Sequence, residues 1–253
     1  MKSESESHAN SQTDSLMAVI PAAGNGSRMQ ANIPKQFLTV ANRTLLEYSI
    51  EAVLNDARVE QVFVAVSDPN AEYLIELKKS LPTKVHFVQG GNSRAESVLA
   101  GVKVVVSQGA THVLVHDAAR PCLPKTALAA VINTGLTDPQ GAILAIPVRD
   151  SLKRAVISVN DETGVTHVES SVDREALWQA QTPQVFNAER LQQAIEHMGA
   201  LNPQLTDEAS AMQWCGFQPA LIPGSIRNLK VTHPEDFECV RDWLLANNND
   251  HKN

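Results

Sequence analysis

The stretch AVIPAAGNGSRMQANIPK, residues 18–35, has the residue types and spacing that binding of a polyphosphate requires. An apolar segment runs directly into a loop that contains Gly24 and Gly26. Glycines let a backbone approach a ligand closely, and successive exposed N–H groups in such a loop form an anion-binding concavity. Arg28 and Lys35 then supply two positive charges. Because open α/β sheets bind ligands at the carboxyl ends of their strands, the pattern predicts a nucleoside triphosphate site there.

Two common phosphate-binding motifs do not fit this loop. A Walker loop requires a glycine followed by lysine, and neither glycine of the loop has one. The dinucleotide fingerprint requires a third glycine where Met29 stands, and Pro34 interrupts the helix that should follow. A dinucleotide-dependent dehydrogenase stays a distant alternative, with Glu47 near the position of its ribose-binding acid.

Composition limits the class of protein. The chain has 253 residues, 43% of them hydrophobic, and a net charge of −7, which disfavours broad binding to nucleic acid or to anionic membranes. Three widely spaced cysteines favour neither a disulfide framework nor a zinc site, and they fit a cytoplasmic protein. No apolar run reaches the roughly 18 residues of a membrane span. We expect residues 1–15 and 248–253 to be disordered or flexible tails.

Apolar segments alternate with amphipathic segments along most of the chain. We expect strands at residues 62–66, 85–88, 112–117 and 142–148, and helices at 44–55, 70–80, 93–107 and 124–133. Ser93 and Glu96 form a capping-box pattern at the start of the third of these helices. The alternation predicts an α/β fold with a mostly parallel sheet and helices on both faces.

The pattern changes at residues 149–172, which alternate apolar and polar residues around a turn-rich centre at 160–164. This arrangement predicts a β-hairpin. Because an isolated two-stranded ribbon is marginally stable, we expect it to pack against the same hairpin of a second subunit in a twofold homodimer. With the hairpin as an inserted arm, residues 16–247 are expected to form a single domain.

The remaining segments complete that domain. We expect helices at residues 173–180, 188–198 and 206–215, and strands at 218–222 and 227–231. A last helix is expected to open with a capping box formed by Thr232 and Glu235.

Asp117 and Arg120 follow the apolar segment HVLVH, so we expect them at the same sheet edge as the glycine loop. A strand-end aspartate can cap a turn, but in nucleotide enzymes it often contacts a metal or a sugar hydroxyl, and we favour the functional interpretation. The histidines at 112, 116 and 167 lack metal-ligand spacing and are expected to be structural.

Seven segments share a cation or small polar residue at an expected strand end or loop: AAGNGSRM…PK, GGNSRAES, VHDAARP, PVRDSLKR, VDR, LTDEAS and NLKVT. In this order, over about residues 17–244, the chain resembles the 2-C-methyl-D-erythritol 4-phosphate cytidylyltransferase family. The resemblance implies a Rossmann-like nucleotidyltransferase domain with a β-arm that interlocks a homodimer. It also implies transfer of CMP from CTP to methylerythritol phosphate in the non-mevalonate isoprenoid route.

The resemblance implies roles for individual residues. Arg28 and Lys35 would stabilise the charge that develops at the α-phosphorus of CTP, and Arg174 and Lys230 would hold the acceptor phosphate. The residues implied in CTP binding are Ala22, Ala23, Gly24, Gly26, Gly91, Asn92 and Ser97. Those implied in acceptor binding are Asp117, Arg120, Ser151, Arg174, Thr206 and Lys230.

Several points stay open at this level. Mg²⁺ is implied mainly on the CTP phosphates, and Asp117 contacts either this metal or the acceptor hydroxyls. Ser151 and Arg174, on or beside the arm, are expected to serve the partner's site. Thr206 could instead cap its helix. A ribitol 5-phosphate cytidylyltransferase is the nearest alternative function, and a non-catalytic nucleotide-binding dimer is a more distant one.

Overall fold

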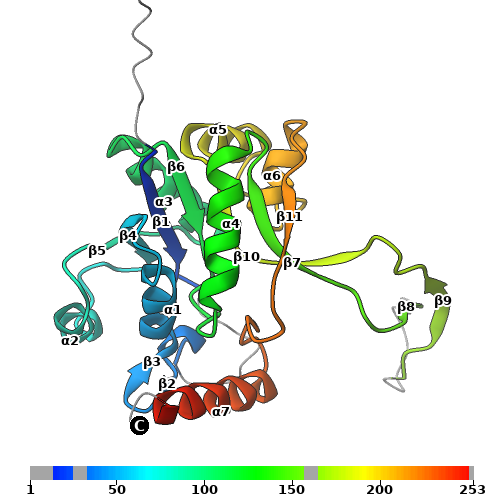
Figure 1. The fold of residues 1–253 in the computed structure, drawn as a ribbon, viewed down its shortest axis with the longest axis horizontal. Coiled ribbons are helices and arrows are strands. Elements are labelled where there is room, and N and C mark those ends of the chain that lie inside the picture. Colours follow the sequence, from blue (N-terminus) through cyan, green and yellow to red (C-terminus); the bar gives the residue numbers. More distant parts are fainter. Residues whose placement is uncertain (1–13, 25–32, 157–164, 251–253) are drawn as a thin grey trace, which may run out of the picture.

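A seven-stranded mixed sheet forms the centre of the molecule in the computed structural model, which describes residues 14–24, 33–156 and 165–250 (Figure 1). The spatial order of its strands is β11 (Ala220–Pro223), β7 (Ala142–Pro147), β10 (Trp178–Asn187), β6 (His112–Val115), β1 (Leu16–Pro21), β4 (Val59–Val66) and β5 (Val85–Gln89). Only β10 runs antiparallel to its neighbours. The mostly parallel sheet predicted from the sequence is confirmed.

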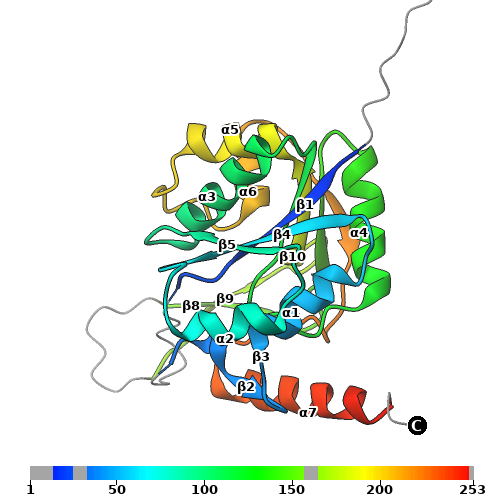
Figure 2. The same cartoon turned by 90° about the vertical axis from the view of Figure 1, so that its left-hand side faces the viewer.

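Helices cover both faces of this sheet (Figure 2). They are α1 (Leu45–Leu54), α2 (Tyr73–Ser80), α3 (Arg94–Ser107), α4 (Lys125–Thr137), α5 (Ala188–Met198), α6 (Glu208–Trp214) and α7 (Pro234–Asp250). A 3₁₀ turn at Lys35–Phe37 and a two-residue hairpin of β2 (Thr39–Val40) and β3 (Arg43–Thr44) precede α1. Among the described residues, no helix is both long and apolar enough to span a membrane.

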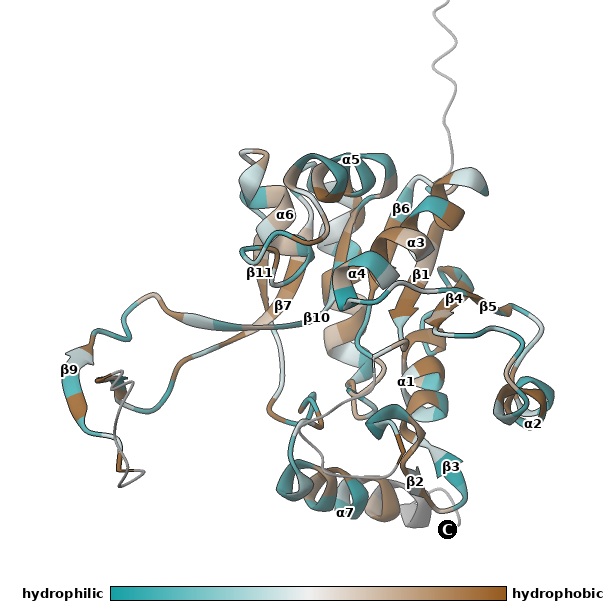
Figure 3. Ribbon diagram, turned by 180° about the vertical axis from the view of Figure 1, so that it is seen from behind, coloured by the Kyte–Doolittle hydropathy of each residue, from teal (hydrophilic) through white to brown (hydrophobic). Residues whose placement is uncertain are grey.

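Side-chain alternation along β1 divides the core between the two faces. Leu16, Ala18 and Ile20 pack with α1 and α4, whereas Met17 and Val19 pack with α3 and α5. The central strands are accordingly hydrophobic while the visible face of α5 is polar (Figure 3). Burial on both sides explains why these strands read as continuous apolar runs.

Helix starts follow the predicted chemistry at two sites. Ser93 accepts a hydrogen bond from the Glu96 N–H, and the Glu96 carboxylate accepts one from the Ser93 N–H. Thr44 and Glu47 form the same capping box on α1. Glu47 therefore closes a helix start, which removes the support for the dehydrogenase alternative.

The expected hairpin is present as an arm that projects from the body (Figure 1). Its strands β8 (Leu152–Ala155) and β9 (Val168–Val172) pair antiparallel and form a sheet of their own. Val156 and Val168 on the arm are 46% and 64% exposed. The central turn at 160–164 lies outside the described residues.

The sequence-based expectation fails at β10. We expected a helix at residues 173–180, but Trp178–Asn187 is a strand inserted between β6 and β7. Pro183, which disfavours a central strand, lies where the pairing with β7 shifts register between Ala180 and Gln184. Val185 and Phe186 beyond it are fully buried, so the core outweighs the local signal.

Two expectations near the C-terminus are also wrong. Residues 227–231 form a turn and an irregular segment rather than a strand. At the start of α7 it is Asp236, not Glu235, whose carboxylate accepts hydrogen bonds from the backbone N–H groups of Thr232 and His233. The irregular segment places Lys230 beside the sheet edge.

Candidate active site

A cavity of about 230 Å³ opens at the carboxyl ends of β1 and β6. The connections that follow these two neighbouring parallel strands lead toward opposite edges of the sheet. Open α/β sheets bind ligands at such a switch point. Its lining residues come from five segments: Pro21, Ala22, Ala23, Gly24, Lys35, Gln36, Arg94, Ser97, Asp117, Ala118, Ala119 and Lys230. The glycine loop, Asp117 and Lys230 are thus brought together as predicted.

The described part of the glycine loop is held by a residue that the sequence did not single out. Gln36, which is 4% exposed, donates hydrogen bonds to the carbonyl oxygens of Ala22 (2.7 Å) and Gly24 (2.9 Å). Its neighbour Lys35 reaches across the cavity, where Nζ lies 2.8 Å from the Val231 carbonyl oxygen. The ammonium groups of Lys35 and Lys230 therefore belong to one face of the molecule.

Asp117 is the centre of a cluster of cations. Its Oδ1 lies 3.0 Å from Arg94 Nε, and its Oδ2 lies 2.9 Å from Lys230 Nζ and 3.3 Å from Arg120 Nε. Glu208, 2% exposed, binds the other end of Arg94 at 2.7 and 3.1 Å. Arg94 and Glu208 are 114 residues apart in the chain, and no local pattern indicated this pair.

Burial and charge act against each other in this cluster. Burial disfavours the charged form of Asp117, but Arg94, Lys230 and Arg120 outweigh it and hold the pKa of this carboxyl well below its usual value. Burial likewise opposes the charge on Arg94, but Glu208 and Asp117 raise the pKa of its guanidinium above the ordinary value. The carboxylate of Asp117 and the guanidinium of Arg94 are therefore both charged at neutral pH.

A second cavity of about 260 Å³ adjoins the first and shares Arg94, Asp117 and Lys230 with it. The residues that line only this second cavity are Arg120, Ala180, Gln181, Thr182, Gln184, Thr206 and Asp207. We call the first the nucleotide cavity, because the resemblance implies CTP binding for its residues Ala22–Gly24 and Ser97. We call the second the acceptor cavity, because the resemblance implies acceptor binding for Arg120 and Thr206.

Size alone does not identify the site, because larger cavities lie elsewhere on the described chain. One of about 330 Å³ lies between α1, α4 and α7, and one of about 560 Å³ lies beside α1 and α2. Neither contains Asp117, Lys35 or Lys230. The pair of smaller cavities holds the convergent cations at the strand ends, so we assign the site there.

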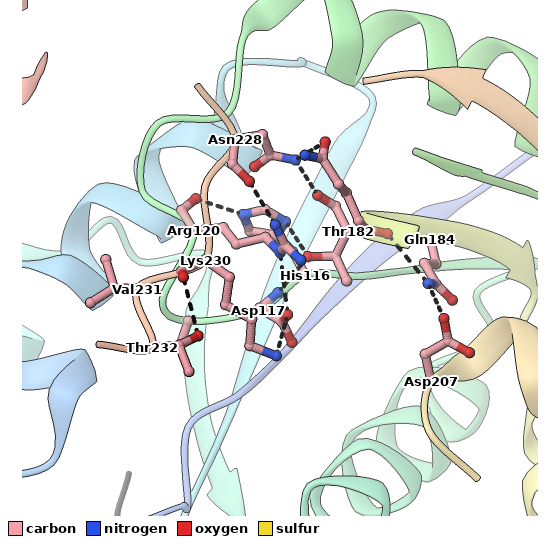
Figure 4. Close-up of polar contacts among 12 residues, drawn as sticks. His116, Asp117, Arg120, Thr182, Gln184, Asp207, Asn228, Lys230, Val231 and Thr232 are labelled. Carbon is pink, nitrogen blue, oxygen red and sulfur yellow. Dashed lines mark hydrogen bonds and ion pairs between the residues drawn. The ribbon is translucent and has the colours of Figure 1, made fainter. Parts of the chain in front are cut away.

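A buried polar layer from β10 and residues 225–231 supports the acceptor cavity (Figure 4). His116 Nε2 donates to the Arg120 carbonyl oxygen at 3.0 Å, and Nδ1 accepts from Thr182 Oγ1 at 3.1 Å. Arg120 Nη1 donates to the Asn228 carbonyl oxygen at 2.6 Å, and Asn228 Nδ2 donates to the Thr182 carbonyl oxygen at 2.7 Å. The main chains around Asp117 and Lys230 are therefore tied to the same strand.

His116 is expected to make stability depend on pH. Burial lowers the pKa of His116 to about 4, whereas an unfolded histidine titrates near 6.5. Between these values the unfolded chain binds a proton that the folded chain does not, so stability falls as the pH falls through this window. We predict that wild type loses roughly 3 kcal/mol more between pH 7 and 4 than His116→Gln, at about 1.4 kcal/mol per pKa unit.

Urea unfolding at several pH values measures this difference. His197→Gln, a change of an exposed histidine, is the control and should keep the wild-type pH dependence. Equal slopes for wild type and His116→Gln would contradict the assignment of a neutral buried imidazole.

Other predicted site residues lie outside this assembly. Ser151 and Arg174 are exposed on and beside the arm, where Arg174 Nη1 donates to the Arg149 carbonyl oxygen. Asn92 is exposed and lines neither cavity. Gly26 and Arg28 lie outside the described residues.

Gly91 and Ser97, which the resemblance implies in CTP binding, contact each other. The Gly91 N–H donates to Ser97 Oγ at 3.1 Å, so this segment is fixed to the start of α3. A Cβ on the preceding Gly90 would lie 2.9 Å from Ala23 Cβ, which shows how closely the segment approaches the glycine loop. Thr206 does not cap α6, because Asp207 does.

A magnesium ion carried by substrate phosphates fits this donor set. Asp117 is the only carboxylate lining the first cavity in the described chain, and the described residues contain no group of three or more potential metal ligands. Mg²⁺ is commonly bound through one or two carboxylates together with substrate phosphates and water. The oxygens of Asp117 are contacted by three cations, and Asp207 is a second carboxylate that lines the other cavity.

Comparisons with known proteins relate the chain to one family of enzymes. The family model described as 2-C-methyl-D-erythritol 4-phosphate cytidylyltransferase matches residues 16–245. A protein of that name from Idiomarina loihiensis is 95% identical over 253 residues, 100% of both chains, and one from Shewanella amazonensis is 44% identical over 236 residues, 93% of this chain and 96% of its own. A crystal structure described as 4-diphosphocytidyl-2C-methyl-D-erythritol synthase matches with a TM-score of 0.76 at 37% identity, covering 92% of this chain and 99% of its own.

Proposed function

Because the chain belongs to the 2-C-methyl-D-erythritol 4-phosphate cytidylyltransferase family, we propose that it transfers CMP from CTP to methylerythritol phosphate. The products are 4-diphosphocytidyl-2-C-methyl-D-erythritol and pyrophosphate, in the non-mevalonate route to isoprenoid precursors. The observation that carries the proposal is the pair of adjoining cavities that share Arg94, Asp117 and Lys230. A nucleotide in one cavity and an acceptor in the other would meet at these shared residues.

The reaction is an in-line displacement. An oxygen of the acceptor phosphate forms a bond to the α-phosphorus of CTP, and the bond from that phosphorus to the pyrophosphate oxygen breaks. Such a reaction needs little covalent chemistry from the protein, and the rate depends on positioning and on stabilisation of negative charge. Lys35 on the nucleotide side and Lys230 between the cavities are placed to supply that stabilisation, and Arg28 is assigned the same role by the family resemblance.

On the nucleotide side, the backbone of Ala22–Gly24 would run alongside the triphosphate. Gln36 fixes this backbone through the carbonyl groups of Ala22 and Gly24. Ser97, Gly91 and Asn92 are proposed to contact the base and ribose. On the acceptor side, Arg120 and Thr206 face the second cavity with Lys230. Asp117 would hold these cations in position and contact either an acceptor hydroxyl or the metal.

Mg²⁺ belongs to this proposal as a metal bound mainly by the CTP phosphates. When bound, it would offset phosphate charge and orient the pyrophosphate leaving group. Asp117 is the one carboxylate of the first cavity that could contact it. Lys35 and Lys230 would contact the same phosphates.

The arm is proposed to form a homodimer and to complete the partner's site. Its described strands form a separate two-stranded sheet with exposed apolar residues, which alone is marginally stable in water. Ser151 and Arg174 line neither of the two cavities of their own chain, and the arm formed by β8 and β9 projects away from the body (Figure 1). A second copy would bring the cation of Arg174 to an acceptor phosphate and cover the exposed valines.

Mixing two inactive variants tests this sharing. Arg174→Ala and Lys230→Ala are each expected to lose nearly all turnover as homodimers. After subunit exchange, each mixed dimer has one site with both residues intact, so about a quarter of wild-type activity should return at equal amounts. If the two residues serve one site of the same chain, mixing restores nothing, and the shared-site proposal fails.

Pyrophosphate release tests the function itself. The protein with CTP, Mg²⁺ and methylerythritol phosphate should release pyrophosphate, and omission of the acceptor should stop the release. Ribitol 5-phosphate and the other nucleoside triphosphates are the controls. Preference for ribitol phosphate would replace the proposed acceptor, and no release with any acceptor would overturn the transferase function.

A further inference from the structure

Glu208 is a buried charged residue that the proposed reaction does not use. It is the first residue of α6 and is 2% exposed. Both of its carboxylate oxygens bind Arg94, Oε1 to Nη1 at 2.7 Å and Oε2 to Nη2 at 3.1 Å. This is the bidentate geometry of an arginine–carboxylate pair.

Arg94 lines both substrate cavities, and its side chain is 30% exposed. A guanidinium in such a place is well suited to bind two oxygens of a phosphate. Here, however, Nη1 and Nη2 are directed to Glu208 and Nε is directed to Asp117. All three nitrogens of the Arg94 guanidinium therefore contact protein carboxylates. Lys35 and Lys230 also line the nucleotide cavity, where Lys35 contacts the Val231 carbonyl oxygen and Lys230 contacts Asp117.

The three residues lie on elements that border the two cavities. Arg94 begins α3 directly after the nucleotide-side glycine segment, and Glu208 begins α6 directly after the acceptor-side Thr206 and Asp207. Asp117 follows β6 between the two cavities. The ion pairs Glu208–Arg94 and Arg94–Asp117 thus connect the walls of both cavities.

We infer that Glu208 is a positioning residue that holds the Arg94 fork away from the substrate phosphates. As a result, Lys35 and Lys230 bind the phosphates and Arg94 does not. The same contacts fix the carboxylate of Asp117 between the cavities. The inference rests on the proposed transfer reaction. A purely structural role, in which Glu208 only fastens α6, would leave the anion affinity of the site unchanged.

Glu208→Gln separates these two roles because it preserves size and removes the charge. A guanidinium released from its partner should bind inorganic pyrophosphate, so we expect product inhibition by pyrophosphate to tighten roughly tenfold, the effect of one charge-assisted hydrogen bond. Turnover should fall about 10- to 100-fold, because Asp117 and the phosphates are no longer held in the reactive geometry. Michaelis constants for CTP and the acceptor are measured in the same series.

Three further variants make the test specific. Adding Arg94→Gln to Glu208→Gln removes the released fork and should return pyrophosphate inhibition to the wild-type level or weaker. Glu208→Asp keeps the charge and should keep wild-type inhibition. Glu196→Gln, which breaks the exposed pair with Lys103, is the matched control and should change neither quantity.

The outcomes distinguish this inference from the function on which it rests. Wild type that releases no pyrophosphate overturns the proposed function. Active wild type together with a folded Glu208→Gln whose pyrophosphate inhibition is unchanged overturns the inference alone. Tighter inhibition that persists in the double variant also overturns it, because the added affinity then does not come from Arg94.

Discussion

Lys35→Ala is expected to lower kcat by about 10²–10³-fold, the usual effect of removing one group that stabilises developing charge. The Nζ of Lys35 lies in the nucleotide cavity at 2.8 Å from the Val231 carbonyl oxygen, next to Lys230. In the proposed reaction the two phosphates would meet beside it, and of the cations that line this cavity in the described chain, Lys35 is the one that does not also line the second cavity. Because the loss is confined to the transition state, kcat/KM for CTP should fall by about as much as kcat.

The fold should survive this substitution. Lys35 is only partly buried, and its truncation removes a hydrogen bond whose net contribution to stability is about 1 kcal/mol. Lys103→Ala is the matched control, because Lys103 lies in α3 about 13 Å along the helix from Arg94 and its pair with Glu196 is exposed. Wild-type kcat in Lys35→Ala would contradict the assignment of this lysine.

Asp117→Asn is expected to affect both stability and turnover. Its carboxylate contacts Arg94, Arg120 and Lys230, and its side chain is only 8% exposed. Replacing it by a neutral amide leaves three cations close together without their anion, and breaking a buried ion pair in this way costs about 3–5 kcal/mol. Turnover should fall as well, since Lys230 and Arg120 lose the group that sets their positions.

The pH dependence of stability checks the same assignment. The pKa of Asp117 lies well below its usual value because its cationic neighbours outweigh burial. Its charge therefore stabilises the fold fully above the unfolded pKa of about 3.9, and this contribution is lost as the pH falls toward the lower folded value. Wild type should lose this stabilisation in acid, and Asp117→Asn should show no such loss.

Urea unfolding at pH 7 gives the cost of the change directly. Asp56→Asn is the control, because it breaks the pair with Arg58, a cation that is 38% exposed, and should cost about 1 kcal/mol or less. If Asp117→Asn costs no more than Asp56→Asn, the account of a tightly charged centre is wrong.

The local parts of the fold were predictable because they depend on local chemistry. The capping box of Ser93 and Glu96, the strand that ends before Asp117 and the hairpin at residues 149–172 each follow from neighbouring residues. Helix and strand periodicity then places the ligand loops at one sheet edge. The sequence therefore predicted which segments meet.

The parts that could not be predicted depend on distant contacts. Strand β10 carries a proline inside it, and only its place between β6 and β7 makes Trp178–Asn187 a strand. Arg94 and Glu208 join helices far apart in sequence, and Gln36 differs from any surface glutamine only through the two carbonyl groups it contacts. The structural role of each of these residues follows from contacts with residues distant in sequence and not from the local sequence pattern.

The residues to which the family resemblance assigns a role also fall into two groups, according to whether one chain brings them together. Ala22, Lys35, Asp117, Arg120 and Lys230 gather at the two cavities of one chain. Arg174 and Ser151 do not, and their proposed role requires a second copy. The fold of one chain brings together the residues at the sheet edge, whereas the proposed role of the arm residues needs a homodimer.

A crystal structure with CTP and Mg²⁺ tests the central claim most directly, namely that cations from separate segments converge to bind phosphates where β1 and β6 end. We predict the triphosphate along Ala22–Gly24, with a phosphate oxygen within hydrogen-bond distance of Lys35 Nζ. A nucleotide bound instead in the larger cavity of about 330 Å³ beside Tyr48 and Trp243 would contradict the claim.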